Sequence, residues 1–479
     1  MKTCLVWLHQ DLRLSDNPAL YHAAEAADTL IPVYIHAPQE LEPWAPGAAS
    51  RWWCHHSLST LQQALHARGS RLIIRRGASQ DVLQRLIRET GAGAVYWNHR
   101  YAPQAARRDA HIAAWLRAHD IEVHTYHGNL LYTPGSVLTK EHKPFRVFTP
   151  FWRACRQQGL GAPPLPVPQR LGECRLASEA VEALALLPDI PWHHGLASSW
   201  RPGEDNALEQ LQGFCDAALA HYDAGRDRPD RLDTSRLSPH LAFGEISPRQ
   251  VVSAVLNAFM DHATQGDSMD RFLSELGWRE FAYHTLHHFP YATDTPLNPR
   301  FEAFPWRDDK ALLRAWQQGK TGFPIIDAGM RQLWHSGWMH NRVRMIVASF
   351  LTKNGLQPWQ TGARWFWDTL VDADLASNSF NWQWVAGCGL DAAPYFRIFN
   401  PVRQSERFDP HGDYLRQWLP ELAQLPLPWL HRPWLTPADV QHACNVRIGR
   451  DYPAPILDLN SSRKRALNLS RQLPCVTNA

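Results

Sequence analysis

The sequence predicts a two-part protein, with a doubly wound α/β domain built on a parallel five-stranded sheet and an all-α domain after it. At 479 residues the chain is longer than one hydrophobic core usually supports. Its first 130 residues alternate short β-like runs with helical stretches, whereas the residues beyond about 201 carry helical patterns. We therefore expect an α/β domain over residues 1–130, a connector over 131–200 and a helical domain over 201–479.

The expected strands are short apolar runs rich in β-branched and aromatic residues. They are CLVWL at 4–8, LIPVYIH at 30–36, RLIIR at 71–75, AVYWN at 94–98 and IEVHTY at 121–126. Helical stretches at 19–27, 48–68, 80–89 and 105–119 separate them. The glycines of GAGAV at 91–95 precede a strand instead of following one, so we expect a turn that ends a helix and not a phosphate loop.

The connector is marked by prolines, including the run GAPPLPVP at 161–168, because each proline removes a backbone donor and interrupts regular structure. Beyond it, helices are expected at 204–224, 248–262, 269–288, 308–318 and 339–353.

Composition excludes several classes of protein. No apolar window is long enough for a membrane span, and the charged start does not suit a signal peptide. Eight cysteines without zinc-ligand spacing favour the cytoplasm and argue against a metal site. A net charge of +3 is too small to prove nucleic-acid binding, but 22 tryptophans, mostly beyond residue 191, are more than packing usually needs.

The segment TSRLSPHLAFGEISP, from Thr234, is a Ser/Thr-rich turn leading into a helix. Such a turn can cradle a diphosphate through free N–H groups and the positive end of the helix dipole. Its hydroxyls could equally be capping groups.

Several longer motifs follow one another in a characteristic order. They are VWLHQDLRLSDNPAL near the start, KPFRVFTPFW from 143, SELGWREF from 274, FPWR from 304, TGFPIIDAGMRQLWHSGWMHNRVRMIVASFL from 321 and DADLASNSFNWQW from 372. In this order and spacing the chain resembles the photolyase/cryptochrome family, most closely the class I photolyases that split cyclobutane pyrimidine dimers. The resemblance implies FAD as cofactor, ultraviolet-damaged DNA as partner and a monomeric enzyme that works under blue light.

The resemblance assigns a flavin site. The FAD phosphates and ribityl chain would be held by Tyr222, Thr234, Ser235, Leu237 and Ser238. The ring system would be surrounded by Trp338, Asn341, Arg344, Asp372, Asp374 and Asn378. Arg344 and Asp372 match the family's ion pair, and Asn378 the residue near flavin N5. The other interpretation of Asp372 and Asp374 is a solvated turn or a DxD metal site, but no third ligand accompanies them.

The resemblance also assigns the damage pocket. Glu275 and Trp278 share one face of a helix, where the indole could stack on a flipped pyrimidine pair and the carboxyl group could meet its polar edge. Trp384 would form a second wall, and Met345 and Asn341 would complete the pocket. Counting Asn378 beside the flavin, the groups expected to act in catalysis are Glu275, Asn378, Trp278, Trp384 and Met345.

Arginines and tryptophans complete the assignment. Arg226, Arg342 and Arg397 match positions that contact DNA phosphates in the family. Trp382, Trp359 and Trp306 match its electron relay to the flavin, although each alone would be interpreted as a core aromatic residue.

Two alternative functions stay open. A cryptochrome-type photoreceptor shares the fold and FAD but signals through partners, and a (6-4) photolyase would carry histidines where this chain has Asn341 and Met345. An antenna chromophore, either 5,10-methenyltetrahydrofolate or a deazaflavin, is also an expectation. Its presence is open because Gln104 and Ala105 replace the Asn and Glu of folate-binding relatives, and His9 and Gln10 depart from the family pattern after the first strand.

Overall fold

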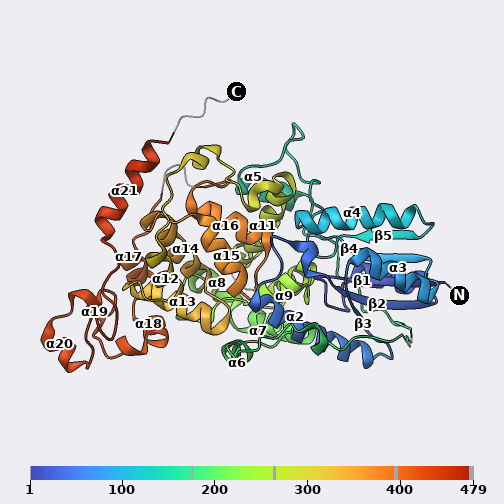
Figure 1. Cartoon of the computed structure of the whole chain (residues 1–479), viewed down its shortest axis with the longest axis horizontal. Helices are drawn as coiled ribbons and strands as arrows, with labels where there is room; N and C mark the ends of the chain where they lie inside the picture. The colour runs from blue at the N-terminus through green and yellow to red at the C-terminus, as the bar shows by residue number, and fades with distance from the viewer. Residues whose placement is uncertain (1, 173, 175, 263–265, 393–396, 474–479) are drawn as a thin grey trace.

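The N-terminal part of the chain forms a five-stranded sheet in which every pairing is parallel. The computed structural model describes residues 2–172, 174, 176–262, 266–392 and 397–473, with the sheet at one end of the long axis and the helical part at the other (Figure 1). The strands are β1 (Thr3–Leu8), β2 (Thr29–His36), β3 (Ile73–Arg76), β4 (Ala94–Asn98) and β5 (Glu122–Tyr126), in the order β3-β2-β1-β4-β5. The doubly wound five-stranded sheet is therefore confirmed.

Two helices cover each face of the sheet. Helices α1 (Pro18–Ala26) and α2 (Ala48–His66) share a core with one set of strand side chains, and α3 (Ser79–Thr90) and α4 (Pro103–Arg117) share a core with the alternate set. Both faces are buried, which is why these strands are apolar runs and not alternating ones. Gly91 ends α3 at φ 64°, so GAGAV is the expected helix-ending turn.

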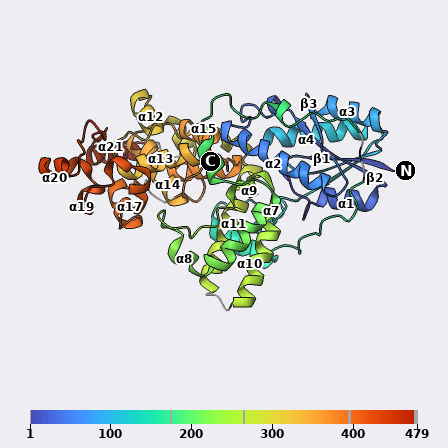
Figure 2. The ribbon, with the colours of Figure 1, turned by 90° about the horizontal axis from the view of Figure 1, so that it is seen from below.

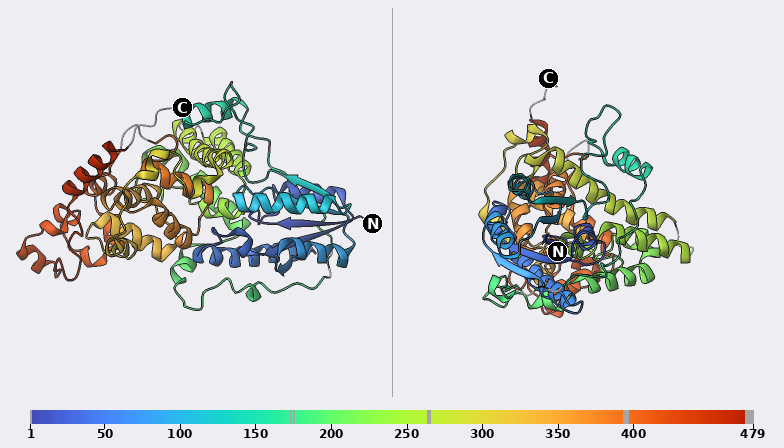
Figure 3. Two further views of the ribbon diagram at one scale, coloured as in Figure 1. Left: turned by 45° about the horizontal axis from the view of Figure 1, so that its top comes forward. Right: turned by 90° about the vertical axis from the view of Figure 1, so that its right-hand side faces the viewer.

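The segment from 131 to 200 is mostly irregular, as its prolines indicate, but it contains α5 (Phe148–Gln157) and the short α6 (His194–Ser199). Between them the chain runs along the outside of the α/β part (Figure 3). There Leu171, Val181 and Leu184 bury themselves in the core beneath α2, and the amide of Glu179 donates to the Ile74 carbonyl (3.1 Å) at the β3 edge. This stretch of the connector is thus attached to the β3 edge and to the core beneath α2.

The rest of the chain is helical. Its helices are α7 (Glu204–Ala217), α8 (Tyr222–Gly225), α9 (Ser238–Phe243), α10 (Pro248–His262), α11 (Gly266–His288), α12 (Lys310–Gln317), α13 (Pro324–Ser336), α14 (Asn341–Ser349), α15 (Trp359–Thr369), α16 (Leu375–Ala386), α17 (Pro401–Phe408), α18 (Asp413–Trp418), α19 (Leu427–Leu430), α20 (Ala438–Ala443) and α21 (Leu459–Arg471). Helices α7, α8, α10 and α11 form a lobe that projects to one side (Figure 2). A second core gathers α12 to α16 with the C-terminal helices.

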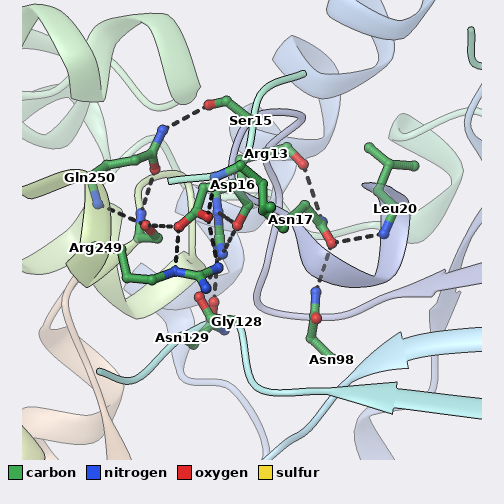
Figure 4. A network of polar contacts seen from close by, with 12 residues as sticks. Arg13, Ser15, Asp16, Asn17, Leu20, Asn98, Gly128, Asn129, Arg249 and Gln250 are labelled. Atoms are coloured by element: carbon green, nitrogen blue, oxygen red, sulfur yellow. Dashed lines mark hydrogen bonds and ion pairs between the residues drawn. The ribbon is translucent and has the colours of Figure 1, made fainter. Parts of the chain in front are cut away.

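A buried polar network joins the two parts (Figure 4). The Arg13 guanidinium is fully buried and donates to the carbonyls of Gly128 (2.6 Å) and Gly244 (2.8 Å). The buried Asp16 carboxylate pairs with Arg249 of α10 at 2.7 Å. Gly244 has φ 63°, and a Cβ there would lie 2.1 Å from the Gln10 carbonyl oxygen, so only glycine allows the contact. The loop after β1 is therefore held by the helical part.

Helix α11 carries a second link, through Glu280. This buried carboxylate accepts from the amides of Leu131 (3.1 Å) and Tyr132 (3.2 Å), and it lies 3.7 Å from the Arg279 guanidinium. Burial nevertheless raises the pKa of Glu280 from 4.5 to about 7.

The shift at Glu280 makes stability depend on pH. Between pH 4.5 and 7 the unfolded chain has lost this proton and the folded chain still holds it, so the group lowers the free energy of unfolding as pH rises. Glu280→Gln cannot ionise, so its stability relative to wild type should rise from pH 5 to pH 8, by at most about 3 kcal/mol. Urea unfolding at four pH values measures this difference. The exposed control Glu302→Gln should follow wild type throughout; a difference that does not change with pH would refute the assignment.

Candidate functional site

The Arg344–Asp372 ion pair is the centre of the candidate flavin site. Arg344 of α14 donates to both carboxylate oxygens of Asp372, at 3.1 and 2.7 Å, and its Nε donates to the Met339 carbonyl at 2.7 Å. Such a two-bond pair fixes the planes of both groups as well as their distance. The Asp372 side chain is 3% exposed and that of Arg344 is 23% exposed, so the pair opens toward solvent on the arginine side.

The pair is extended by residues of the Thr234 segment. Ser238, at the start of α9, donates to Asp372 Oδ2 at 2.6 Å and accepts from Trp338 Nε1 at 3.3 Å. Leu237 is buried, and Thr234 and Ser235 are half-buried. No side chain caps α9. The Ser235 hydroxyl oxygen accepts from the Leu237 amide at 3.5 Å, and the Ser238 hydroxyl ties the start of α9 to the ion pair.

Arg236 belongs to the same segment and was missed from the sequence. Its guanidinium lies over the rings of Trp200 (4.2 Å) and Trp338 (5.4 Å), and its Nε is buried without a hydrogen-bond partner. No carboxylate of the described residues lies within 4 Å of it, and burial lowers its pKa. A partly buried cation without an anion suits a diphosphate. Its place between Ser235 and Leu237 was the available signal.

Asp374 and Asn378 lie on α16. Asp374 caps this helix by accepting from the Ser377 amide at 2.7 Å, and its other oxygen accepts from the Tyr283 hydroxyl. The buried Asn378 donates to the Ala363 carbonyl at 3.0 Å, which ties its amide to α15. Asp374 is thus a helix cap and not part of a solvated turn.

His340, between Trp338 and Asn341, was also missed. It caps α14 by accepting from the Arg342 amide at 3.2 Å, and its Nε2 is buried without a partner. Burial lowers the pKa of His340 to about 4, so the ring is neutral at physiological pH. The nearby Asn341 is exposed, and Tyr222 is buried beneath Arg226, whose guanidinium lies 5.5 Å from its ring.

Two of the proposed damage-pocket residues, Trp278 of α11 and Trp384 of α16, are linked through shared neighbours. Trp278 stacks on Phe148 with ring centroids 3.7 Å apart at 11°, so one face of the indole is covered by the protein. Trp384 donates to the Asp391 carbonyl (3.2 Å), and the Asp391 carboxylate accepts from the Phe148 amide (3.2 Å). Both indoles are therefore linked through Phe148 and Asp391, a connection that spacing along the chain could not indicate.

The charged residues of this region form pairs. Arg226 donates to Glu275, and Arg342 donates to Asp227 at 2.7 Å and lies 3.9 Å from Met345 Sδ. Arg397 is exposed, and its carbonyl accepts from the Lys353 ammonium. Arg226 and Arg342, two of the three arginines expected to bind phosphates, are thus already paired with a carboxylate of the protein.

The three relay tryptophans belong to one core, two of them buried inside it and one at its edge. Trp359 and Trp382 are buried there, and Trp306 is half-buried against it. The Trp382 ring packs on Gly362, where a Cβ would lie 2.1 Å from it, and is 5.0 Å from the Phe366 ring. A half-buried Trp306 beside two buried tryptophans suits an entry point for electrons from the surface.

A second candidate site lies at the carboxyl ends of β1 and β4, where the strand order reverses and open α/β sheets bind ligands. Buried polar atoms of Trp7, His9, Trp97 and Asp109 have no partner there. Arg108 lies 4.8 Å from the Trp7 ring. These groups could hold a second, aromatic chromophore.

In the described residues, no group of three or more His, Cys, Asp or Glu side chains could hold a metal ion. Across the same residues, no helix is both long and apolar enough to span a membrane.

Both halves of the chain match known protein families. The family described as DNA photolyase matches residues 4–169, and the one described as FAD binding domain of DNA photolyase matches residues 272–472. FAD is therefore the cofactor of this domain. The unpaired Arg236 guanidinium and the bidentate Arg344–Asp372 pair of the candidate site fit its diphosphate and polar ring edge.

Individual relatives cover nearly the whole chain. A deoxyribodipyrimidine photo-lyase of Agrobacterium fabrum is 47% identical over 97% of this chain and 96% of its own. Cryptochrome-2 of Arabidopsis thaliana is 38% identical over 98% of this chain and 79% of its own. The crystal structure of a class III photolyase from Agrobacterium tumefaciens has a TM-score of 0.95 at 45% identity, covering 99% of this chain and 98% of its own.

The similar structure is described as class III, whereas the motifs alone suggested class I. Family matches over both halves, identity above 30% along the full length and the same two-part fold agree with one another. The chain therefore belongs to the photolyase/cryptochrome family.

Proposed function

We propose that the protein repairs cyclobutane pyrimidine dimers in DNA in a light-dependent reaction. The observation that carries the proposal is the face of α11 on which Glu275 and Trp278 lie one turn apart, with Glu275 paired to Arg226 and with Arg342 held nearby by Asp227. Asn341 and Met345 stand where (6-4) enzymes of the family carry histidines, which favours the cyclobutane lesion.

Different residues are proposed to hold the flavin, the lesion and the DNA phosphates. FAD held at this site would supply, in its fully reduced form, light-driven one-electron transfer to the dimer and back. Arg344, Asp372 and Ser238 would orient the flavin, and Asn378, which α16 places with its amide tied to the Ala363 carbonyl, would lie beside the ring. Trp278 and Trp384 hold the extruded lesion, because stacking offsets the lost base stacking, and Glu275 hydrogen-bonds its polar edge. Arg226, Arg342 and Arg397 bind the phosphates.

A duplex with one defined lesion tests the function. Reduced, FAD-loaded protein should restore a cyclobutane dimer to two pyrimidines under blue light, with no reaction in darkness and none on a (6-4) photoproduct. Repair of the (6-4) lesion alone would favour that branch of the family. Repair of neither lesion would favour the cryptochrome-type photoreceptor, an alternative supported by the 38% identity to cryptochrome-2.

Two further expectations belong to this proposal. The crevice at β1 and β4 is our candidate site for an antenna, either methenyltetrahydrofolate or a deazaflavin. The absorption spectrum of the purified protein, minus that of FAD, would identify it. The protein is proposed to act as a cytoplasmic monomer, and the cysteines of the described residues are all free, as a reducing compartment requires.

Glu275→Ala should bind FAD as wild type does but repair less per absorbed photon. The Glu275 side chain is 29% exposed and pairs with Arg226, not with Arg344, Asp372 or Ser238 of the candidate flavin site. Losing one charge-assisted hydrogen bond to the lesion should lower the quantum yield by roughly tenfold. Actinometry on a dimer-containing oligonucleotide measures this yield. Loss of FAD from the variant would instead make Glu275 a structural residue.

A further inference from the structure

Four charged side chains form a continuous row beside the damage pocket. Glu275 of α11 accepts from Arg226, the Arg226 Nε lies 3.9 Å from Asp227 Oδ1, and Asp227 Oδ2 accepts from Arg342 of α14 at 2.7 Å. Positive and negative groups alternate, so the row has no net charge. Asp227 is its central link, because it is the only member in contact with both arginines.

The row satisfies its arginines only in part. The Nε atoms of Arg226 and Arg342 are both buried and have no hydrogen-bond partner among the described residues. The Arg226 and Arg342 side chains are 11% and 20% exposed, while that of Asp227 is 37% exposed. An unpaired buried donor costs free energy, so the closed row is not the best arrangement for either arginine. An incoming anion could accept a hydrogen bond from these unpaired Nε atoms.

A DNA phosphate bound by either arginine would lie close to the Asp227 carboxylate. Like charges at such distances repel, and the phosphate must either tolerate Asp227 or displace it. Intact DNA gives Glu275 no new hydrogen-bond partner. Its phosphates therefore approach arginines that are still paired with Glu275 and Asp227. A flipped lesion gives Glu275 new hydrogen bonds, which release Arg226 and open the row from that end.

We propose that Asp227 is a specificity-determining residue that competes with DNA phosphates for Arg226 and Arg342, and so weakens binding to intact DNA more than binding to the lesion. The inference rests on the proposed repair function. It makes the discrimination between damaged and intact DNA depend on a residue that need not touch the lesion.

The test compares Asp227→Asn with Asp223→Asn. Asp223 lies on α8, is 61% exposed and has only a distant contact (4.0 Å) with Arg271, so its change removes the same unit of charge outside the row. Dissociation constants are measured in the dark for matched duplexes with and without one dimer, at several KCl concentrations. Asp227→Ser serves as a second variant, and FAD content and circular dichroism check folding.

In Asp227→Asn, binding to intact duplex should tighten roughly fivefold, the upper range for a partly exposed ion pair. The slope of log affinity against log salt should steepen by about 0.9, as for one added phosphate contact. Lesion binding should change less, so the preference for damaged DNA falls. Asp223→Asn should keep the wild-type preference.

Two results would overturn the inference. Weaker binding of Asp227→Asn and Asp227→Ser to both duplexes would mean that Asp227 positions the arginines. If Asp223→Asn changed both dissociation constants as much as Asp227→Asn does, the effect would come from net charge and not from the row. Failure of the proposed function looks different, because wild-type protein itself would then show no preference for the dimer.

Discussion

Trp306→Phe should abolish blue-light reduction of FAD while leaving repair by chemically reduced enzyme intact. The benzene ring is much harder to oxidise than indole, and each 1.4 kcal/mol added to the barrier slows the step about tenfold, so a loss of at least about a hundredfold is expected. Trp306 is half-buried at the edge of its core, and a swap between aromatic rings there should cost little stability. Photoreduction is followed spectroscopically with an external thiol present.

The matched control for this variant is Trp418→Phe. Trp418 is half-buried against the same core, and its Nε1 has no hydrogen bond to lose. It should photoreduce as wild type does. Undiminished photoreduction in Trp306→Phe would mean that electrons enter through other tryptophans, and failure of the chemically reduced variant to repair would make Trp306 structural.

Asp372→Asn should release FAD. This carboxylate receives two bonds from Arg344 and one from Ser238, so the amide leaves a cation unpaired at the site and removes an acceptor. Breaking a buried ion pair costs about 3 kcal/mol or more, which corresponds to roughly a hundredfold weaker FAD binding. Titration of flavin-free protein with FAD measures the dissociation constant.

Glu421→Gln provides the control for Asp372→Asn. Its carboxylate pairs with Arg331 at 2.7 Å, and the two side chains are 23% and 28% exposed, so this ion pair is more open than the Arg344–Asp372 pair and shares no residue with it. It should lose some stability and keep its FAD affinity. If Asp372→Asn lowered the melting temperature without changing FAD affinity, the Arg344–Asp372 pair would be structural.

The sequence predicted the α/β part closely because local patterns decide it. The expected strands at 30–36 and 94–98 differ from β2 and β4 by at most one residue at each end. Helix 248–262 was likewise expected with the bounds that α10 has. In these elements propensity, periodicity and burial all favour the same structure.

Packing between distant segments overrode local propensity elsewhere. The helix expected over 204–224 ends at Ala217, and the chain then turns so that Leu219 and Tyr222 both enter the core formed by Phe214 and Phe272. The helix expected over 339–353 becomes a π-helix from Phe350, which buries Lys353. Neither outcome is encoded within the segment concerned.

The same distinction applies to the site. The resemblance selected the residues of the Arg344–Asp372 pair, but the stacking of Phe148 on Trp278, the unpaired Arg236 and the central place of Asp227 each depend on segments far apart in the chain. Periodicity within one segment cannot report such contacts. Arg236, Phe148 and Trp278 lay within motifs that had already been chosen, whereas Asp227 lay outside all of them.

The network of Figure 4 limits how the protein can be divided. Arg13 and Asp16 are wholly buried charges, and several of their partners, among them Gly244 and Arg249, belong to the helical part. Cutting the chain between the two parts would leave these charges in an apolar surface without partners, at a cost of several kcal/mol. The two halves have different architectures but are not independent modules. They should unfold in a single calorimetric transition, and neither half should be exchangeable with that of a distant relative unless the loop after β1 is exchanged with it.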